Sequence, residues 1–290
     1  MLEATENISD NPLVSIIVRT KDRPALLKAA LNSIINQTYD NIEVVIVNDG
    51  GCSIDDTIYT LSKQLKIIYV DHQVNKGRSL AANTGLSNSN GKMISFLDDD
   101  DLFLPDHIAT LVNALKSDNS IGLVYSDCRK EDYNQKQIEI PFITIRRDNI
   151  FHGKNYDRLL LYRENYIPLI TALFRKEILH KSGPFDEEMN VYEDWDLWIR
   201  MSMHTEFKRI EKITCKYRIF GKRDYNYLEG QMKIYKKYHY IYTPQQMRYW
   251  LHDIQSENHQ LRSELADFIG VKKSKIKRLI KKILTPLNPD

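Results

Sequence analysis

Met93-Ile94-Ser95-Phe96-Leu97-Asp98-Asp99-Asp100-Asp101 is an apolar run that stops abruptly at four consecutive carboxylates. The run predicts a buried parallel strand that carries the aspartates at its carboxyl end, where open α/β sheets bind their ligands. Four adjacent like charges repel one another, so the cluster needs a cation or a set of hydrogen-bond donors. One interpretation is a divalent metal that links these carboxylates to a diphosphate. The other is a solvated acidic turn that also caps the next helix.

Apolar strands alternate with amphipathic helices before this stretch. The expected strands lie at 13–18, 42–47 and 66–70, and the expected helices at 25–36, 53–65 and 77–86. Such alternation implies a parallel sheet with helices on both faces. The sequence has no GxGxxG fingerprint and no P-loop, which argues against a dinucleotide cofactor and against a P-loop ATP site.

Composition describes an ordinary soluble globular protein of 290 residues, with 42% hydrophobic and 28% charged residues and a net charge of +2. The three cysteines are far apart and odd in number, which fits a reducing compartment rather than a disulfide framework. The polar segment 1–10 does not resemble a signal peptide, and no apolar run reaches the length of a membrane span. We therefore expect a cytoplasmic protein, with peripheral attachment to the cytoplasmic face of a membrane as an option.

Five segments, in order, resemble the family 2 glycosyltransferases. They are the opening strand and turn at 13–24, the helix with its Gln-Thr-Tyr ending at 31–39, the second strand and acidic turn at 42–51, the Asn-x-Gly motifs within 75–86, and the Asp-x-Asp signature at 96–101. The resemblance implies the GT-A fold, a mixed, mostly parallel sheet flanked by helices, here followed by a C-terminal helical tail. It also implies a nucleotide-diphosphate-sugar donor, a divalent metal (Mn or Mg) and inversion at the anomeric carbon.

Individual residues take expected roles from this resemblance. Nucleotide-sugar binding is expected of Thr20, Asp22, Asp49, Arg78, Asp98 and Asp99, and metal binding of Asp98 and Asp100. Asp49 would reach the base, and Asp100 would be the main metal ligand. Arg78 enters because many family members carry an arginine where this chain has Ala82, and Arg78 lies one helical turn earlier.

A second acidic stretch, Tyr192-Glu193-Asp194-Trp195-Asp196-Leu197-Trp198-Ile199-Arg200, reads as the start of a helix. Carboxylates there interact favourably with the free N–H groups and the helix dipole, which is the commoner explanation. The stretch also resembles the family's Glu-Asp-x-Asp-Leu-Trp-x-Arg segment, which implies that Asp194 is the catalytic base. A carboxylate within hydrogen-bond reach can accept the proton of a sugar hydroxyl. Glu193, Trp195 and Asp196 are expected to contact the acceptor or to support the site, with burial as the alternative for Trp195.

The remaining part of the second half gives weaker signals. Residues 129–155 are polar and irregular, which predicts a loop or short hairpin near a glycan or lipid-linked acceptor. His107 is expected on a helix surface. Tyr217-Arg218 resembles a family segment in which a histidine often follows, but this chain has Phe220, so Lys222 and Arg223 are candidates for that role.

The C-terminal tail has a different periodicity. Apolar residues at heptad spacing over 247–268 predict either a short homodimeric coiled coil or an amphipathic helix folded back on its own domain. Residues 272–284 form a basic amphipathic pattern that is typical of helices on anionic membrane surfaces, with a plain solvated helix as the alternative. Nucleic-acid binding is not favoured, because no aromatic stacking residues accompany the basic ones.

The predicted organisation is an N-terminal tail (1–11), a donor-binding half (12–102), an acceptor-binding and catalytic half (103–222), a helical extension (223–270) and a basic tail (271–290). The predicted function is an inverting, metal-dependent glycosyltransferase in polysaccharide or cell-envelope glycan synthesis. The alternatives are a non-catalytic scaffold at a membrane surface and a nucleotidyltransferase of related fold. The latter would want a glycine-rich basic loop after the first strand, whereas 19–24 contains no glycine.

Overall fold

The computed structural model describes residues 11–133, 145–151, 153–189, 191–220 and 227–241. The chain divides into two compact units, Met1–Asp224 and Tyr225–Asp290, and we treat each by itself. Within the described residues, the second unit contains α8 (Tyr227–Lys237) and a short 3-10 turn, His239–Ile241. The heptad segment 247–268, the basic segment 272–284, and Lys222 and Arg223 lie outside the described residues.

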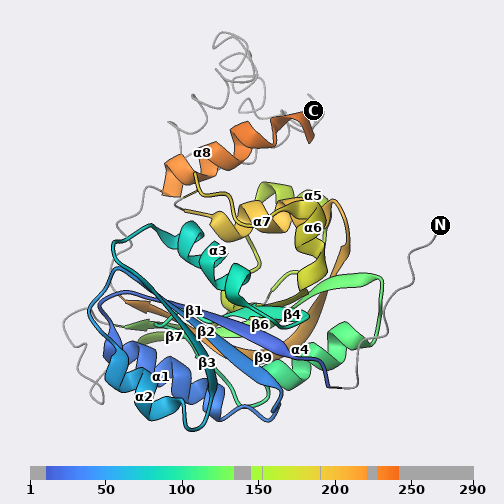
Figure 1. The fold of residues 1–290 in the computed structure, drawn as a ribbon. Helices are drawn as coiled ribbons and strands as arrows, with labels where there is room; N and C mark the ends of the chain where they lie inside the picture. Colours follow the sequence, from blue (N-terminus) through green and yellow to red (C-terminus); the bar gives the residue numbers. More distant parts are fainter. Residues whose placement is uncertain (1–10, 134–144, 152, 190, 221–226, 242–290) are drawn as a thin grey trace, which may run out of the picture. The chain divides into compact units, whose positions relative to one another are not determined.

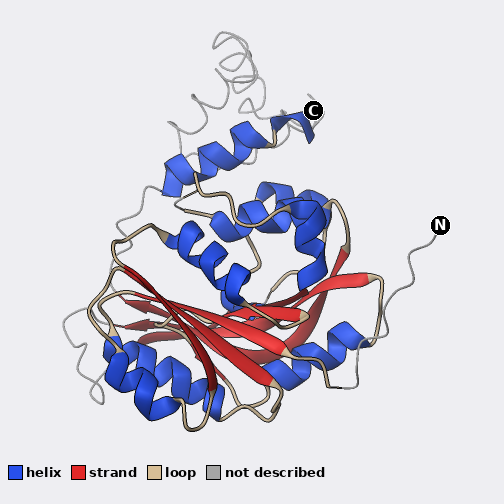
Figure 2. Ribbon diagram, in the orientation of Figure 1, coloured by secondary structure: helices blue, strands red, loops and turns tan. Residues whose placement is uncertain are grey.

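One mixed sheet forms the centre of the first unit, and within the described residues it has nine strands (Figures 1 and 2). Eight of them follow the order β3-β2-β1-β4-β8-β6-β9-β5, and β7 pairs with β6. The strands are β1 (Val14–Thr20), β2 (Ile42–Asp49), β3 (Lys66–His72), β4 (Met93–Phe96), β5 (Leu102–Phe103), β6 (Ile121–Tyr133), β7 (Ile145–Phe151), β8 (Ala172–Arg175) and β9 (Glu206–Phe220). Strands β1 to β4 run parallel to one another, which confirms the expected mostly parallel sheet.

Helices cover both faces of this sheet. They are α1 (Pro24–Ile35), α2 (Asp55–Leu61), α3 (Arg78–Asn88), α4 (His107–Lys116), α5 (Arg158–Arg163), α6 (Leu179–Ser182) and α7 (Glu193–Ser202). Figure 1 shows α1, α2 and α4 on one face and α3, α5, α6 and α7 on the other. Strand β1 is buried along its whole length, as parallel strands covered on both sides are. Its even-numbered apolar residues join the core beneath α1 and α4, so its odd-numbered residues face α3.

The second half departs from the expectation in detail. The strand-like segment 165–175 is a 3-10 turn (Leu169–Thr171) followed by the short strand β8, which enters the sheet antiparallel to both β4 and β6. The expected hairpin within 129–155 is present where described, because the end of β6 pairs with β7. Strand β9 is much longer than the Tyr217-Arg218 segment and runs parallel to β6.

His107 does not lie on a helix surface, as we had predicted, but is fully buried at the start of α4. Its Nδ1 lies 2.6 Å from Thr214 Oγ1, and its ring stacks on Phe103 with 4.0 Å between centroids. Burial lowers the pKa of His107 to about 3, so the ring is neutral. The prediction failed because β9 packs against the start of α4, a contact between distant segments.

Candidate active site

The aspartate cluster lies where β1 and β4 end side by side. Ile17 pairs with Phe96 in parallel register, so the residues after each strand emerge together at one edge of the sheet. The four carboxylates alternate in exposure: the side chains of Asp98 and Asp100 are 29% and 26% exposed, whereas Asp99 and Asp101 are buried. The spacing of the Asp-x-Asp signature therefore presents two carboxylates to solvent.

Arginines from three other segments neutralise this cluster. Arg19 forms a bidentate pair with Asp98, with 2.9 Å from Nε to Oδ1 and 2.9 Å from Nη2 to Oδ2. Arg23 holds buried Asp99 through Nη2, at 2.6 Å from Oδ1, and reaches Asp100 Oδ2 through Nη1 at 2.8 Å. On β9, Arg218 donates its backbone N–H to Asp101 Oδ1 (2.7 Å) and its Nε to the carbonyl of Asp100.

These partners divide the aspartates electrostatically. Burial alone would raise the pKa of Asp98, but Arg19 outweighs it and holds that pKa below the ordinary value. Burial raises the pKa of Asp99 to about 7, with the charge of Asp100 adding to it and Arg23 opposing it. Burial and Asp100 likewise raise the pKa of Asp101. The solvent-facing Asp98 is thus kept ionised by Arg19.

Arg19 also reaches the second acidic stretch, and our sequence analysis did not identify it as a site residue. Its Nη1 donates to Glu193 Oε1 (3.1 Å) and to the carbonyl oxygen of Arg78 (3.2 Å). The guanidinium therefore joins the ends of β1, β4, α3 and α7. The available signal was a charged residue at the end of an otherwise apolar, buried strand, a position that needs a partner elsewhere in the fold.

Asp194 has a different environment from Asp98. Its Oδ1 accepts hydrogen bonds from the backbone N–H of Trp195 (2.8 Å) and from Asn165 Nδ2 (3.1 Å), both neutral donors. Burial and the charge of Glu193 raise the pKa of Asp194 to about 7. The side chain remains partly exposed, so this carboxylate can exchange a proton near neutral pH. Asn165 was not identified from the sequence, because its link to Asp194 joins two distant segments.

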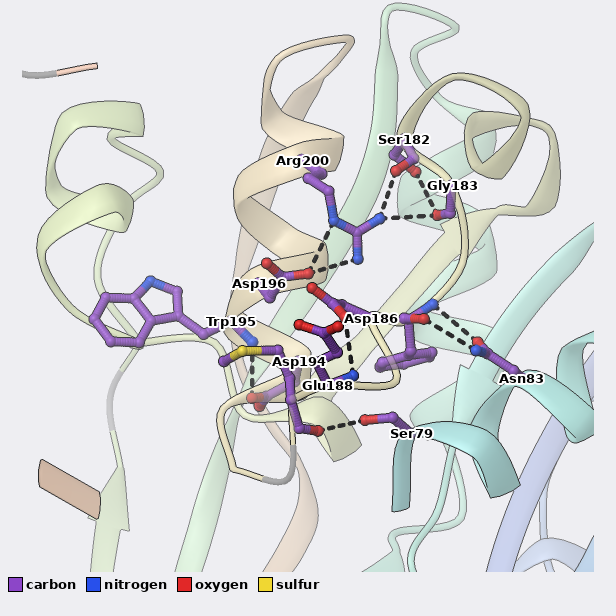
Figure 3. A network of polar contacts seen from close by, with 12 residues as sticks. Ser79, Asn83, Ser182, Gly183, Asp186, Glu188, Asp194, Trp195, Asp196 and Arg200 are labelled. Carbon is purple, nitrogen blue, oxygen red and sulfur yellow. Dashed lines mark hydrogen bonds and ion pairs between the residues drawn. The ribbon is translucent and has the colours of Figure 1, made fainter. Parts of the chain in front are cut away.

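Trp195 and Asp196 are buried, and Figure 3 shows the contact of Asp196 with Arg200. Trp195 is buried, and its indole N–H donates to the carbonyl of Leu161. Asp196 is fully buried and receives two hydrogen bonds from Arg200, at 2.9 and 2.7 Å, while Arg200 also donates to the carbonyl of Ser182. Both side chains are bonded within the protein and anchor helix α7.

Side chains of helix α3 bond to the segment that leads into α7 (Figure 3). Asn83 pairs with the backbone of Phe185, accepting from its N–H and donating to its carbonyl, both at 2.9 Å. Ser79 Oγ donates to the carbonyl of Met189 at 2.6 Å. Asn83 of the Asn-x-Gly motif and Ser79 therefore hold the segment that leads into α7.

The other predicted nucleotide-binding residues lie at the same edge of the sheet. Thr20 Oγ1 donates to Asp99 Oδ2 (2.7 Å), and Asp22 has a positive φ of 56° and accepts from the N–H of Cys52 (2.8 Å). Asp49 accepts from the N–H groups of Lys76 and Gly77, both at 2.9 Å, and its Oδ1 lies 2.8 Å from His72 Nδ1. Asp49 thus holds the loop before α3. The side chain of Arg78 is exposed near Asp98, whose pKa its charge lowers.

Phe220 takes part in an aromatic contact. Its ring stacks on Tyr133 with 5.0 Å between centroids, and the guanidinium of Arg218 lies 5.6 Å from its centroid. The buried Nη2 of Arg218 has no hydrogen-bond partner among the described residues. A buried, unpaired N–H group is uncommon in folded proteins, and this one lies on a residue that also bonds Asp100 and Asp101.

In the described part of the chain, no group of three or more His, Cys, Asp or Glu side chains is arranged so that it could hold a metal ion by itself. The residues nevertheless fit a hard divalent cation, because Asp98 and Asp100 offer carboxylate oxygens at the solvent-facing positions. Magnesium-type sites commonly use one or two carboxylates and take further oxygens from water and substrate phosphates.

Helices able to cross a membrane, judged by length and apolar character, are absent from the described residues.

Comparisons with known proteins agree with this geometry. The family model for glycosyl transferase family 2 matches residues 15–183. An uncharacterized glycosyltransferase of Rickettsia prowazekii is 30% identical over 261 residues, covering 89% of this chain and 80% of that protein. YwdF of Bacillus subtilis, also named an uncharacterized glycosyltransferase, is 28% identical over 198 residues, covering 68% of this chain and 70% of YwdF.

Solved structures share the fold. S. aureus TarS in complex with UDP-GlcNAc superposes with a TM-score of 0.62 at 14% identity, covering 92% of this chain and 83% of TarS 1–349. The mannosyltransferase PcManGT from Pyrobaculum calidifontis, in complex with GDP-Man and Mn2+, gives 0.63 at 19% identity, covering 92% of this chain and 76% of PcManGT. With the sheet order, the aspartate edge and the family match together, the chain belongs to glycosyltransferase family 2 and has the GT-A fold.

Proposed function

We propose that this protein is an inverting, metal-dependent transferase that moves a sugar from a nucleotide-diphosphate donor to a hydroxyl acceptor, with Asp194 as the catalytic base. The observation that carries the proposal is the pair of carboxylate environments joined by Arg19. One side offers ionised, solvent-facing Asp98, and the other offers Asp194, whose pKa burial and Glu193 raise to about 7.

A base with this pKa suits the reaction. A general base is most effective when its pKa lies near the working pH, because it is then ionised and still a strong proton acceptor. The hydrogen bonds from Asn165 and Trp195 hold Oδ1 of Asp194, which leaves Oδ2 for the proton of the acceptor hydroxyl. Attack from the side opposite the departing diphosphate would invert the anomeric carbon.

Asp98 and Asp100 are the residues that would hold a divalent metal. The Mn2+ in the PcManGT complex supports this assignment. When bound, such a cation neutralises charge on a diphosphate leaving group. Arg218, through its unpaired Nη2, and Arg78 would add positive charge from the protein.

The donor is proposed to be a nucleotide sugar because TarS and PcManGT are seen with UDP-GlcNAc and GDP-Man. Thr20, Asp22 and Asp99 would contribute to the nucleoside side of the site, with Asp49 ordering the loop beside it. The acceptor is proposed to be a glycan or a lipid-linked glycan of polysaccharide or envelope synthesis. Membrane attachment through 272–284 and dimerisation through 247–268 remain sequence-based proposals.

Two alternative functions predict features that differ from those of this protein. Asp194 is a partly exposed carboxylate with a raised pKa, and its neighbour Glu193 is linked through Arg19 to Asp98. A non-catalytic scaffold has no need of such a group. A nucleotidyltransferase would want a glycine-rich loop after β1, and 19–24 has none.

Thermal unfolding with UDP, GDP, dTDP and CMP, each with and without Mn2+, tests the proposal first. A ligand that binds only the folded state raises the unfolding temperature by mass action. A metal-dependent rise with one nucleotide identifies the donor class, and transfer from the matching nucleotide sugar must then disappear in Asp194→Asn while the rise persists. A folded protein that responds to none of them would contradict the proposal.

A further inference from the structure

Helix α3 and strand β1 pack closely where Arg19 is located. Ile17 and Arg19 are two residues apart on β1 and therefore face the same side of the sheet. A Cβ at Gly85 would lie 2.3 Å from Ile17 Cγ2, and the carbonyl oxygen of Arg78 lies 3.2 Å from Arg19 Nη1. Ala82, between these two contacts on α3, is fully buried. By helical spacing, Ala82 lies on the same face of α3 as Arg78 and Gly85, the face that packs on β1.

The guanidinium of Arg19 is buried together with the groups that it pairs. It makes a bidentate pair with Asp98 and a further hydrogen bond to Glu193. Burial by itself would lower the pKa of Arg19, but Asp98 and Glu193 reverse the direction and raise it. Removing a partner from such a group is costly, because the remaining charges stay buried without compensation.

Two consequences for the reaction follow from these contacts. The bidentate pair fixes the orientation of Asp98 at the donor edge, because a planar guanidinium matches both carboxylate oxygens. The hydrogen bond to Glu193 places the positive charge of Arg19 beside that carboxylate, which directly precedes Asp194 in the sequence. Arg19 is itself buried, so it acts through these two carboxylates.

We propose that Arg19 is a positioning residue that couples Asp98, at the proposed donor site, to helix α7, which carries Asp194. The small side chain of Ala82 leaves the space that the Arg19 guanidinium occupies. An arginine at position 19 on β1 or at position 82 on α3 could occupy this space, but the space holds only one guanidinium. This inference rests on the proposed function for its effect on transfer. Its geometric part, that residues 19 and 82 share one place, can be tested without any substrate.

A double-mutant cycle of Arg19→Ala and Ala82→Arg provides that test. Ala82→Arg alone should lower the unfolding temperature, because a second guanidinium is forced against Arg19 in a packed site. In the Arg19→Ala background, the same change should raise the unfolding temperature. Asp98 and Glu193 have lost their cation there, and the new arginine can pair with them. Opposite signs in the two backgrounds are the expected result. If Ala82→Arg lowers stability equally in both, the two residues do not share a place and the proposal is overturned.

Transfer kinetics provide the second readout. Arg19→Lys keeps the charge but loses the planar guanidinium that makes the bidentate pair. We expect kcat to fall by about 100-fold, as when reacting groups shift by about 1 Å. The Arg19→Ala/Ala82→Arg double variant should recover transfer relative to Arg19→Ala. Should Arg19→Ala not fold, recovery of folded protein in the double variant takes the place of that comparison. A kcat of Arg19→Lys equal to that of the unchanged protein would overturn the positioning role.

Arg209 offers a matched control. It forms a bidentate pair of the same kind with buried Asp127, at 3.0 Å from Nε to Oδ1 and 2.8 Å from Nη2 to Oδ2. Arg209→Lys should lower stability while kcat stays the same, which separates loss of an ion pair from loss of positioning. If no nucleotide sugar supports transfer by the unchanged protein, the proposed function fails, whereas the stability cycle still decides whether residues 19 and 82 share a place.

Discussion

The two acidic stretches, 98–101 and 193–196, look alike in sequence but differ in what neutralises them. Asp98 receives a bidentate arginine, which keeps its pKa below the ordinary value. Asp194 receives an amide and a backbone N–H, and burial with Glu193 raises its pKa to about 7. Asp196, two residues further on, is again paired with an arginine. The partners therefore separate the two partly exposed carboxylates: an arginine lowers the pKa of Asp98, whereas Asp194, which has only neutral donors, keeps the raised pKa that burial and Glu193 give it.

The largest expected effect is that of Asp194→Asn on transfer. Removing the proposed general base should lower kcat by about 10²–10⁴-fold, while nucleotide binding, measured by thermal shift, is retained. An unchanged kcat would show that another group takes the proton.

The same substitution tests the raised pKa through stability. Because the folded-state pKa of Asp194 lies above the unfolded value, its contribution to stability is fully present below the unfolded pKa and is lost as the pH rises through about 7. Asp194→Asn should therefore be more stable than the unchanged protein at pH 8 and show no gain at pH 4. Denaturant unfolding at the two pH values measures this difference.

The second effect is the opposite response of the neighbouring carboxylate. Asp196→Asn breaks the buried pair with Arg200 and should lower the free energy of unfolding by about 3 kcal/mol. Two aspartates on one helical turn would then change stability in opposite directions at pH 8. A loss of stability in both variants would mean that the environments differ less than their partners suggest.

A smaller effect is expected from Asn165→Leu. The amide of Asn165 stabilises the ionised form of Asp194, so its loss should raise the pKa of Asp194 further. The acidic limb of the kcat–pH profile should move to higher pH by about one unit, which is the size of a hydrogen bond to a charged group. Activity lost at pH 6.5 should return at pH 8.5.

Tyr166→Phe is a control for local packing at this position, because the Tyr166 hydroxyl donates to the carbonyl of Asp157 and does not contact Asp194. Its pH profile should keep its place. A shift of similar size in both variants would attribute the effect to packing instead of to the amide.

The smallest expected effect concerns Arg23, which is anchored on Asp99 and directs Nη1 at Asp100. Arg23→Gln removes a competitor for the proposed metal ligand, so Mn2+ should bind about threefold more tightly in the absence of nucleotide, in keeping with a partly exposed ion pair. Titration followed by electron paramagnetic resonance measures this change. Lys21→Gln, an exposed lysine in the same turn, should leave Mn2+ binding as it is.

The sequence predicted much of this molecule because local patterns carried the information. Continuous apolar runs that end in polar turns indicated the parallel strands and the edge at which the aspartates gather. The acidic start of α7 was visible for the same reason. The burial of His107 and the antiparallel insertion of β8 between β4 and β6 were not visible, because both depend on which distant segments pack together.

By itself, then, the sequence determined the family, the sheet edge and the two sets of carboxylates, since each is encoded in a short contiguous stretch. Only the tertiary structure decided which carboxylate pairs with which cation. Arg19 meets Glu193 across 174 positions of the chain, and Asn165 meets Asp194 across 29. Protonation depends on such neighbours and on burial, and neither is fixed until the chain has folded.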